Sequence, residues 1–64
     1  MSVMIETIGF SMTQIFIAKD KILSMMQDKE NPDQTRLMMA CGNESEEWIV
    51  NESIDVLRYK YDNA

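Results

Sequence analysis

Short apolar and β-branched runs, separated by polar turns, cover most of the chain. Residues 14–18, 22–27 and 35–41 are rich in Ile, Leu, Met and Phe, and we expect each to form a strand. Residues 48–50 are predicted to be the last strand. Residues 1–13 fit either a first strand or a partly ordered arm.

The segments between these runs carry the charged and turn-forming residues. Lys19, Asp20 and Lys21 indicate a tight turn or a brief irregular step. Residues 28–34 and 42–46 contain Asn, Asp, Pro and Gly, which favour turn geometry. Strands joined by turns this short are most easily antiparallel.

The end of the chain predicts a strand that runs directly into a capped helix. Ser53 can accept hydrogen bonds from the first amides of a helix beginning at Ile54 and ending at about Tyr61. Asp55 lies in the first turn, where the helix dipole favours a carboxylate. Ile54, Leu57 and Tyr61 are spaced so that they share one face of this helix.

These elements predict a mainly β fold of the β-rich α+β type. We expect a small bent antiparallel sheet, or a partial barrel, of four to five strands with one C-terminal helix packed across an opening. Residues 1–64 are expected to form a single domain. The apolar residues assigned to its core are Ile15, Ile17, Ile22, Leu37, Met39, Trp48, Val50, Ile54 and Leu57.

The chain has few ways to cover its own apolar surface. It has 64 residues, of which 45% are hydrophobic, and residues 14–18 are apolar on both faces. A small domain buries a low fraction of its surface and often gains stability from a partner. The sequence therefore predicts a homo-oligomer.

The charge pattern argues against two classes of partner. Eleven acidic and six basic residues give a net charge of −5, and the basic residues are dispersed along the chain. Nucleic acids and anionic membranes are bound by clustered Lys and Arg, so neither is expected as a direct partner. The longest uncharged run, residues 7–18, is too short to span a bilayer. An export signal begins with basic residues ahead of its apolar stretch, whereas here the first basic residue is Lys19. We expect a cytoplasmic location.

The residues that most often carry chemistry are scarce. The chain has no histidine and a single cysteine, Cys41, which is expected to be a buried structural thiol. The acidic residues Asp28, Glu30 and Asp33 do not fit the EF-hand spacing, because Asp33 and Met39 occupy the places of its glycine and its last glutamate. We expect no catalytic residue, no metal and no cofactor, and therefore no enzymatic activity.

Two groups of residues are candidates for partner contacts. Glu44, Glu46 and Glu47 form an acidic patch that either keeps the protein soluble or imitates phosphates. Arg58 and Tyr59, with Lys60, are predicted to form an exposed aromatic and basic tip on the helix.

Residues 15–57 resemble the short FlbD-type proteins encoded in bacterial flagellar operons. The likeness begins with Ile15-Phe16-Ile17 followed by Asp20 and Ile22. It continues through Thr35, Leu37, Met39 and Gly42, and then through Trp48-Ile49-Val50 and Glu52-Ser53-Ile54-Asp55. Ala18 departs from the family's usual Asn, the turn after Gly42 is longer, and residues 1–14 have no counterpart. The resemblance implies a small β-rich fold and a non-enzymatic regulatory role, and it transfers no catalytic residue.

Two functional hypotheses follow. The first is a non-enzymatic interaction or regulatory module of the bacterial or phage cytoplasm, which acts as a homo-oligomer through protein–protein contacts. The alternative is an acidic inhibitor that mimics nucleic acid and blocks a basic groove on a host protein. Dependence on Glu44, Glu46 and Glu47 would distinguish the second from the first.

Overall fold

Within the part of the chain that the structure describes, five stretches form strands and a helix follows them. The computed structural model describes residues 3–64. In chain order its elements are β1 (Met4–Ile8), β2 (Gln14–Ala18), the 3-10 turn η1 (Lys19–Lys21), β3 (Ile22–Gln27), β4 (Thr35–Cys41), β5 (Glu44–Val50) and α1 (Ile54–Asp62). The predicted mainly β class is confirmed. Residues 3–13 contain a first strand and a loop, whereas the part of the predicted arm at residues 1 and 2 lies outside the described residues.

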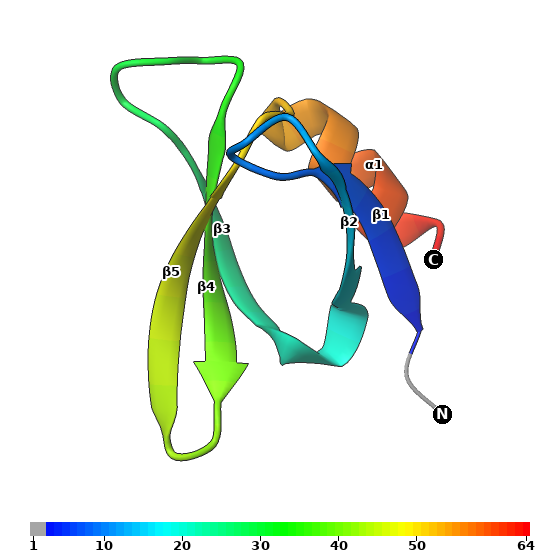
Figure 1. Ribbon diagram of the computed structural model, residues 1–64. Helices are drawn as coiled ribbons and strands as arrows, with labels where there is room; N and C mark the ends of the chain where they lie inside the picture. Colours follow the sequence, from blue (N-terminus) through cyan, green and yellow to red (C-terminus); the bar gives the residue numbers. More distant parts are fainter. Residues whose placement is uncertain (1–2) are drawn as a thin grey trace.

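The strands are arranged in two antiparallel sheets (Figure 1). β1 pairs with β2, and β4 lies between β3 and β5. The sheets meet where Gly9 bridges to Val50 and the amide of Asn51 donates to the carbonyl of Ile8 at 2.7 Å. Within residues 3–64 the sheets do not close into a barrel, because the strand pairing between them is the single bridge from Gly9 to Val50 and not a continuous ladder.

The hairpin between β4 and β5 is longer than predicted. β5 begins at Glu44, where the sequence indicated a turn through residue 46 and a strand only from residue 48. The loop has two residues, Gly42 and Asn43, and Gly42 has a φ of +62°. Glycine adopts this conformation without steric cost, so the charged residues that follow can pair with β4 at once. The tip of this hairpin projects beyond the rest of the molecule (Figure 1).

The core lies between the two sheets and the helix. Its buried residues are Ile5, Ile17, Leu37, Met39, Val50 and Leu57, and Ile15 and Ile22 pack against them at half-burial. The core predictions for Trp48 and Ile54 are wrong. Trp48 is 40% exposed, and Ile54 is half-buried outside the core cluster.

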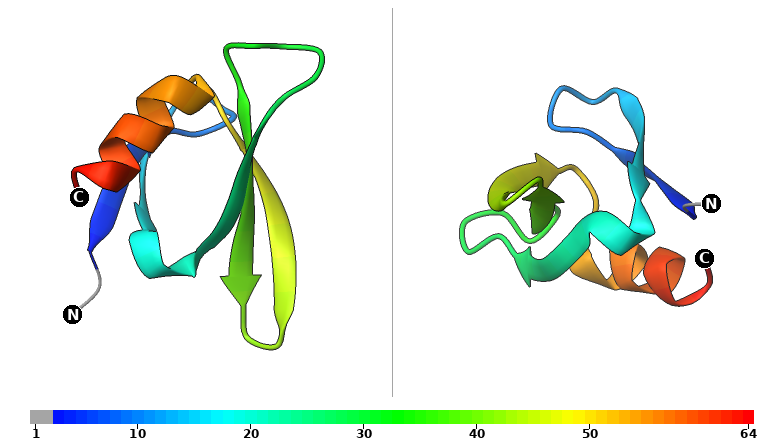
Figure 2. Two further views of the ribbon diagram at one scale, coloured as in Figure 1. Left: turned by 180° about the vertical axis from the view of Figure 1, so that it is seen from behind. Right: turned by 90° about the horizontal axis from the view of Figure 1, so that it is seen from below.

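Helix α1 begins as the sequence predicts. Ser53 has an extended backbone, and its hydroxyl accepts a hydrogen bond from the amide of Val56 at 3.4 Å. Leu57 is 1% exposed and fixes the helix to the core, with Tyr61 packed beside it. Figure 2 shows α1 lying along one side of the molecule, next to β1 and β3, so that its end is near the start of β1.

Cys41 is exposed, which corrects the prediction of a buried thiol. It is the last residue of β4 and lies beside the projecting loop at Gly42. Cys41 is the last residue of the apolar run 37–41, in which Leu37 and Met39 are buried.

Candidate functional site

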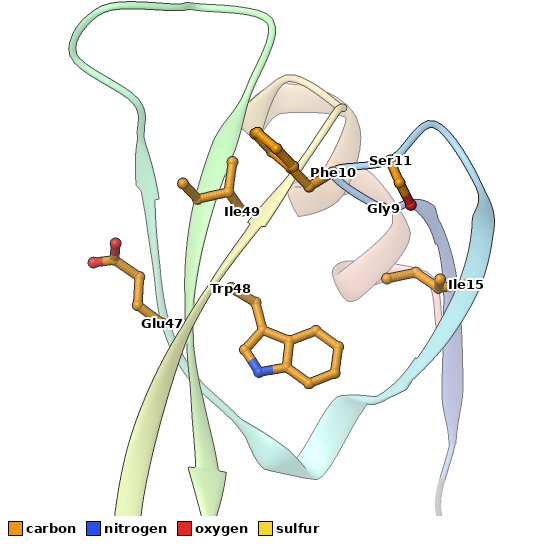
Figure 3. Close-up of a pocket in the computed structure, with 7 residues that line it drawn as sticks. All are labelled: Gly9, Phe10, Ser11, Ile15, Glu47, Trp48 and Ile49. Carbon is orange, nitrogen blue, oxygen red and sulfur yellow. The ribbon is translucent and has the colours of Figure 1, made fainter.

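A groove opens between β5 and the loop that joins β1 to β2 (Figure 3). Its volume is about 460 Å³. Residues from three segments line it, and these are Gly9, Phe10, Ser11, Ile15, Glu47, Trp48 and Ile49. Much of its wall is apolar or aromatic, which is typical of surfaces that bind other molecules.

Trp48 lies on the side of the sheet that faces the core, because it pairs with the buried Leu37 across β4 and β5. It is nevertheless 40% exposed, since β5 is the last strand of its sheet. Figure 3 shows the indole pointing away from β5 toward the side of the groove where Ile15 lies. Its Nε1 donates to a carboxylate oxygen of Glu46 at 3.2 Å. Trp48 therefore stands at the border between core and groove.

Phe10, at 67% exposure, lines the groove from a loop with defined hydrogen bonds. The amide of Gly9 donates to the carbonyl of Thr13 at 2.8 Å, and the amide of Met12 donates to the carbonyl of Gly9 at 2.9 Å. Met12 has a φ of +64°. This pattern matches a three-residue hairpin loop with a left-handed final position, which usually holds glycine.

Asn51 fixes the loop to the other sheet. Its side-chain amide donates to the carbonyls of Gly9 and Phe10 at 3.0 and 2.8 Å, and its Oδ1 accepts from Gln34 at 2.8 Å. The backbone around Phe10 is thus held in place by a residue at the end of β5. Sequence analysis did not identify Phe10 or Asn51 as site residues. The position of Asn51, between the last strand and the helix cap, was the one sequence feature that could have indicated its role.

The predicted acidic patch is divided by the pleat of β5. Glu44 and Glu46 lie on the same face as Trp48, whereas Glu47 lies on the opposite face. Glu47 pairs with Arg36 at 3.4 Å, and Arg36 also donates to Asp28 at 3.0 Å. The three glutamates therefore do not form one surface, which corrects the sequence prediction.

The predicted aromatic and basic tip is smaller than expected. Tyr59 is exposed, and Arg58 is exposed and lies 4.0 Å from Asp62. Lys60 points instead toward β1, where its Nζ donates to the carbonyl of Glu6 at 2.9 Å. Tyr59 borders a second groove of about 340 Å³, which Met4 also lines.

A hydrogen-bond network centred on Glu52 lies between the sheets and the helix. Thr7 and Thr35 are fully buried, and both donate to Glu52, Thr7 to the carboxylate and Thr35 to the backbone carbonyl. Lys60 pairs with the same carboxylate. This network joins β1, β4 and α1, and we assign it a structural role.

No group of three or more Cys, Asp or Glu residues among residues 3–64 is arranged to hold a metal ion. Within the same range, no helix is long and apolar enough to cross a membrane. Comparisons with protein-family models, curated proteins and solved structures found no match.

Proposed function

We propose that this protein is a small non-enzymatic interaction or regulatory module that acts through protein–protein contacts as a homo-oligomer. The observation that carries the proposal is the open groove beside β5, in which Phe10 and Trp48 present exposed aromatic surface. Aromatic residues on a fixed backbone supply much of the binding energy in protein interfaces. The hydrogen bonds from Asn51 to the Phe10 loop provide that fixed backbone.

A separate surface supports self-association. Met4 and Phe16 lie on one face of the sheet formed by β1 and β2, because Met4 pairs with Ala18 and Glu6 pairs with Phe16. Phe16 is 61% exposed, and Met4 is also exposed. The opposite face carries Ile5 and Ile17, which are in the core. A second copy of the chain is the occupant that we propose for the uncovered face.

The acidic mimic is supported less well by the geometry. A phosphate mimic needs several carboxylates directed at one basic groove, whereas Glu47 is turned away from Glu44 and Glu46 and is paired with Arg36. The interaction module uses the apolar surface at Phe10 and Trp48 and does not require the three glutamates to act as one surface. This difference supports the module better than the mimic.

The cellular setting is part of the proposal. We place the protein in the cytoplasm of a bacterium or of a phage-infected cell, where a reducing environment keeps an exposed thiol such as Cys41 reduced. The regulatory role rests on the resemblance of residues 15–57 to the FlbD-type proteins.

The test is a pull-down from the host at low and at high salt. We expect the triple variant with glutamine at Glu44, Glu46 and Glu47 to retain its partner at high salt as the wild type does, and Phe10→Ala to lose it. Leu23→Ala is the matched control, because Leu23 is 60% exposed and lies on β3, away from the groove. Loss of the partner by the glutamine variant, with the partner retained by Phe10→Ala, would favour the mimic.

A further inference from the structure

We propose that the groove accepts an extended, basic segment of a partner protein, which adds to the free edge of β5 as a further strand. This inference rests on the proposed function and names the chemistry of the partner. Strand addition to an exposed sheet edge is an established mode of peptide recognition, in which main-chain hydrogen bonds give affinity and side-chain pockets give specificity.

The backbone of β5 is oriented to accept such a strand. The amide of Asn51 points toward β1, where it donates to Ile8. Successive residues of a strand direct their backbone groups to opposite edges, so Ser45, Glu47 and Ile49 direct theirs to the same edge as Asn51. Among residues 3–64, no strand pairs with β5 on this edge before Val50. The backbone of Glu47 and the amide of Ile49 therefore border the groove with hydrogen-bonding groups available.

The side chains along this edge define what the added strand must carry. Glu44, Glu46 and Trp48 lie at alternate positions on one face of β5. Directly opposite residues of neighbouring strands interact, and opposite charges stabilise the pair. The fitting segment has basic side chains opposite Glu44 and Glu46, and a large apolar side chain two positions further on, against Trp48 and Ile15.

A second copy of the chain fits this edge poorly. Pairing β5 with β5 of another copy about a twofold axis would place the acidic stretch from Glu44 to Glu47 against itself. Like charges directly opposite one another are destabilising. The net charge of −5 adds to this repulsion. The acidic edge and the uncovered face at Phe16 therefore suit different partners.

The experiment uses two synthetic peptides with blocked ends, Lys-Thr-Lys-Thr-Phe and its reversed sequence, because the added strand can run in either direction and the edge is open only before Val50. Binding is followed by the fluorescence of Trp48, the single tryptophan, and mapped by amide chemical shifts in 15N-labelled full chain. We expect one of the two peptides to bind. We expect the shifts to concentrate in β5 and at residues 9–11.

Two controls separate strand addition from general adhesion. A peptide with glutamate in place of lysine should not bind the wild type but should bind the double variant Glu44→Lys, Glu46→Lys, whose affinity for the lysine peptide should fall about tenfold or more. Two further lysine peptides are N-methylated on alternate residues, one at the odd and one at the even positions. The peptide that has lost the amides facing β5 should fail to bind, because it cannot form the main-chain hydrogen bonds.

Several outcomes would overturn the inference: no binding by either peptide, equal affinity for the charge-reversed variant, or shifts centred away from β5. A partner pulled down in a Phe10-dependent manner, together with no peptide binding, would overturn strand addition and leave the interaction module standing. If no partner is pulled down in a Phe10-dependent manner and no peptide binds, the proposed function is overturned as well.

Discussion

The Nζ atom of Lys60 lies 2.9 Å from both carboxylate oxygens of Glu52. The two side chains are 29% and 15% exposed, so the pair is partly screened from solvent. The same carboxylate accepts a hydrogen bond from the buried hydroxyl of Thr7. The Lys60–Glu52 pair therefore connects α1 to β1 as well as to the segment before the helix. The interface between helix and sheet is therefore fixed by polar contacts in addition to Leu57.

Replacing Glu52 with alanine should destabilise the protein by about 1–3 kcal/mol, because the buried hydroxyl of Thr7 loses its acceptor. The measurement is the urea midpoint at fixed protein concentration. Glu47→Ala is the control, since its pair with Arg36 is exposed and should contribute about 1 kcal/mol or less. Equal midpoints for the two variants would show that the Glu52 network has no stabilising role.

The strands and the helix could be predicted because their signals are local. The bounds of β2, β3 and β4 follow runs of apolar and β-branched residues, and the start of α1 follows from Ser53. β5 could not be bounded in this way, since Glu44 to Glu47 lack strand propensity and are extended only because β4 supplies partners. Pairing between strands is a tertiary effect that the pattern of one segment does not contain.

Leu57→Ala should lower the free energy of unfolding by about 2–5 kcal/mol, because the side chain is fully buried and its removal leaves a cavity. Val56→Ala serves as the control on the same helix. Val56 is exposed, and alanine favours the helix more than valine does. The unfolding midpoint of Val56→Ala should therefore equal or exceed that of the wild type. A Leu57→Ala midpoint equal to that of the wild type would mean that the helix is peripheral.

The candidate site was harder to foresee than the core. Trp48 has the sequence signature of a core residue, and its exposure results from the position of β5 at the edge of a sheet. Phe10 lies in a loop with no apolar periodicity, and the hydrogen bonds from Asn51 hold that loop against the other sheet. The groove therefore depends on how the two sheets meet, which strand patterns do not specify.

Met12→Gly should stabilise the protein by up to about 1 kcal/mol. Met12 has a φ of +64°, where a side chain costs roughly 1–2 kcal/mol, and the added flexibility of glycine in the unfolded chain offsets part of the gain. Gly42→Ala is the reciprocal test at a φ of +62° and should destabilise by a similar amount. Thermal unfolding of both variants measures the effect. A lower midpoint for Met12→Gly would show that the methionine side chain makes a contact worth more than the strain.

The uncovered face of β1 and β2 predicts self-association at micromolar concentration. Sedimentation equilibrium should give a mass above the 7.5 kDa of one chain, and Phe16→Ser should shift the distribution toward the monomer, because Phe16 is exposed on that face. Leu23→Ser is the matched control, since Leu23 is equally exposed on the other sheet and should leave the mass unchanged. A single 7.5 kDa species for the wild type across this range would contradict the homo-oligomer. A wild-type oligomer that Phe16→Ser leaves intact would instead move the contact to another surface, such as the groove beside Tyr59.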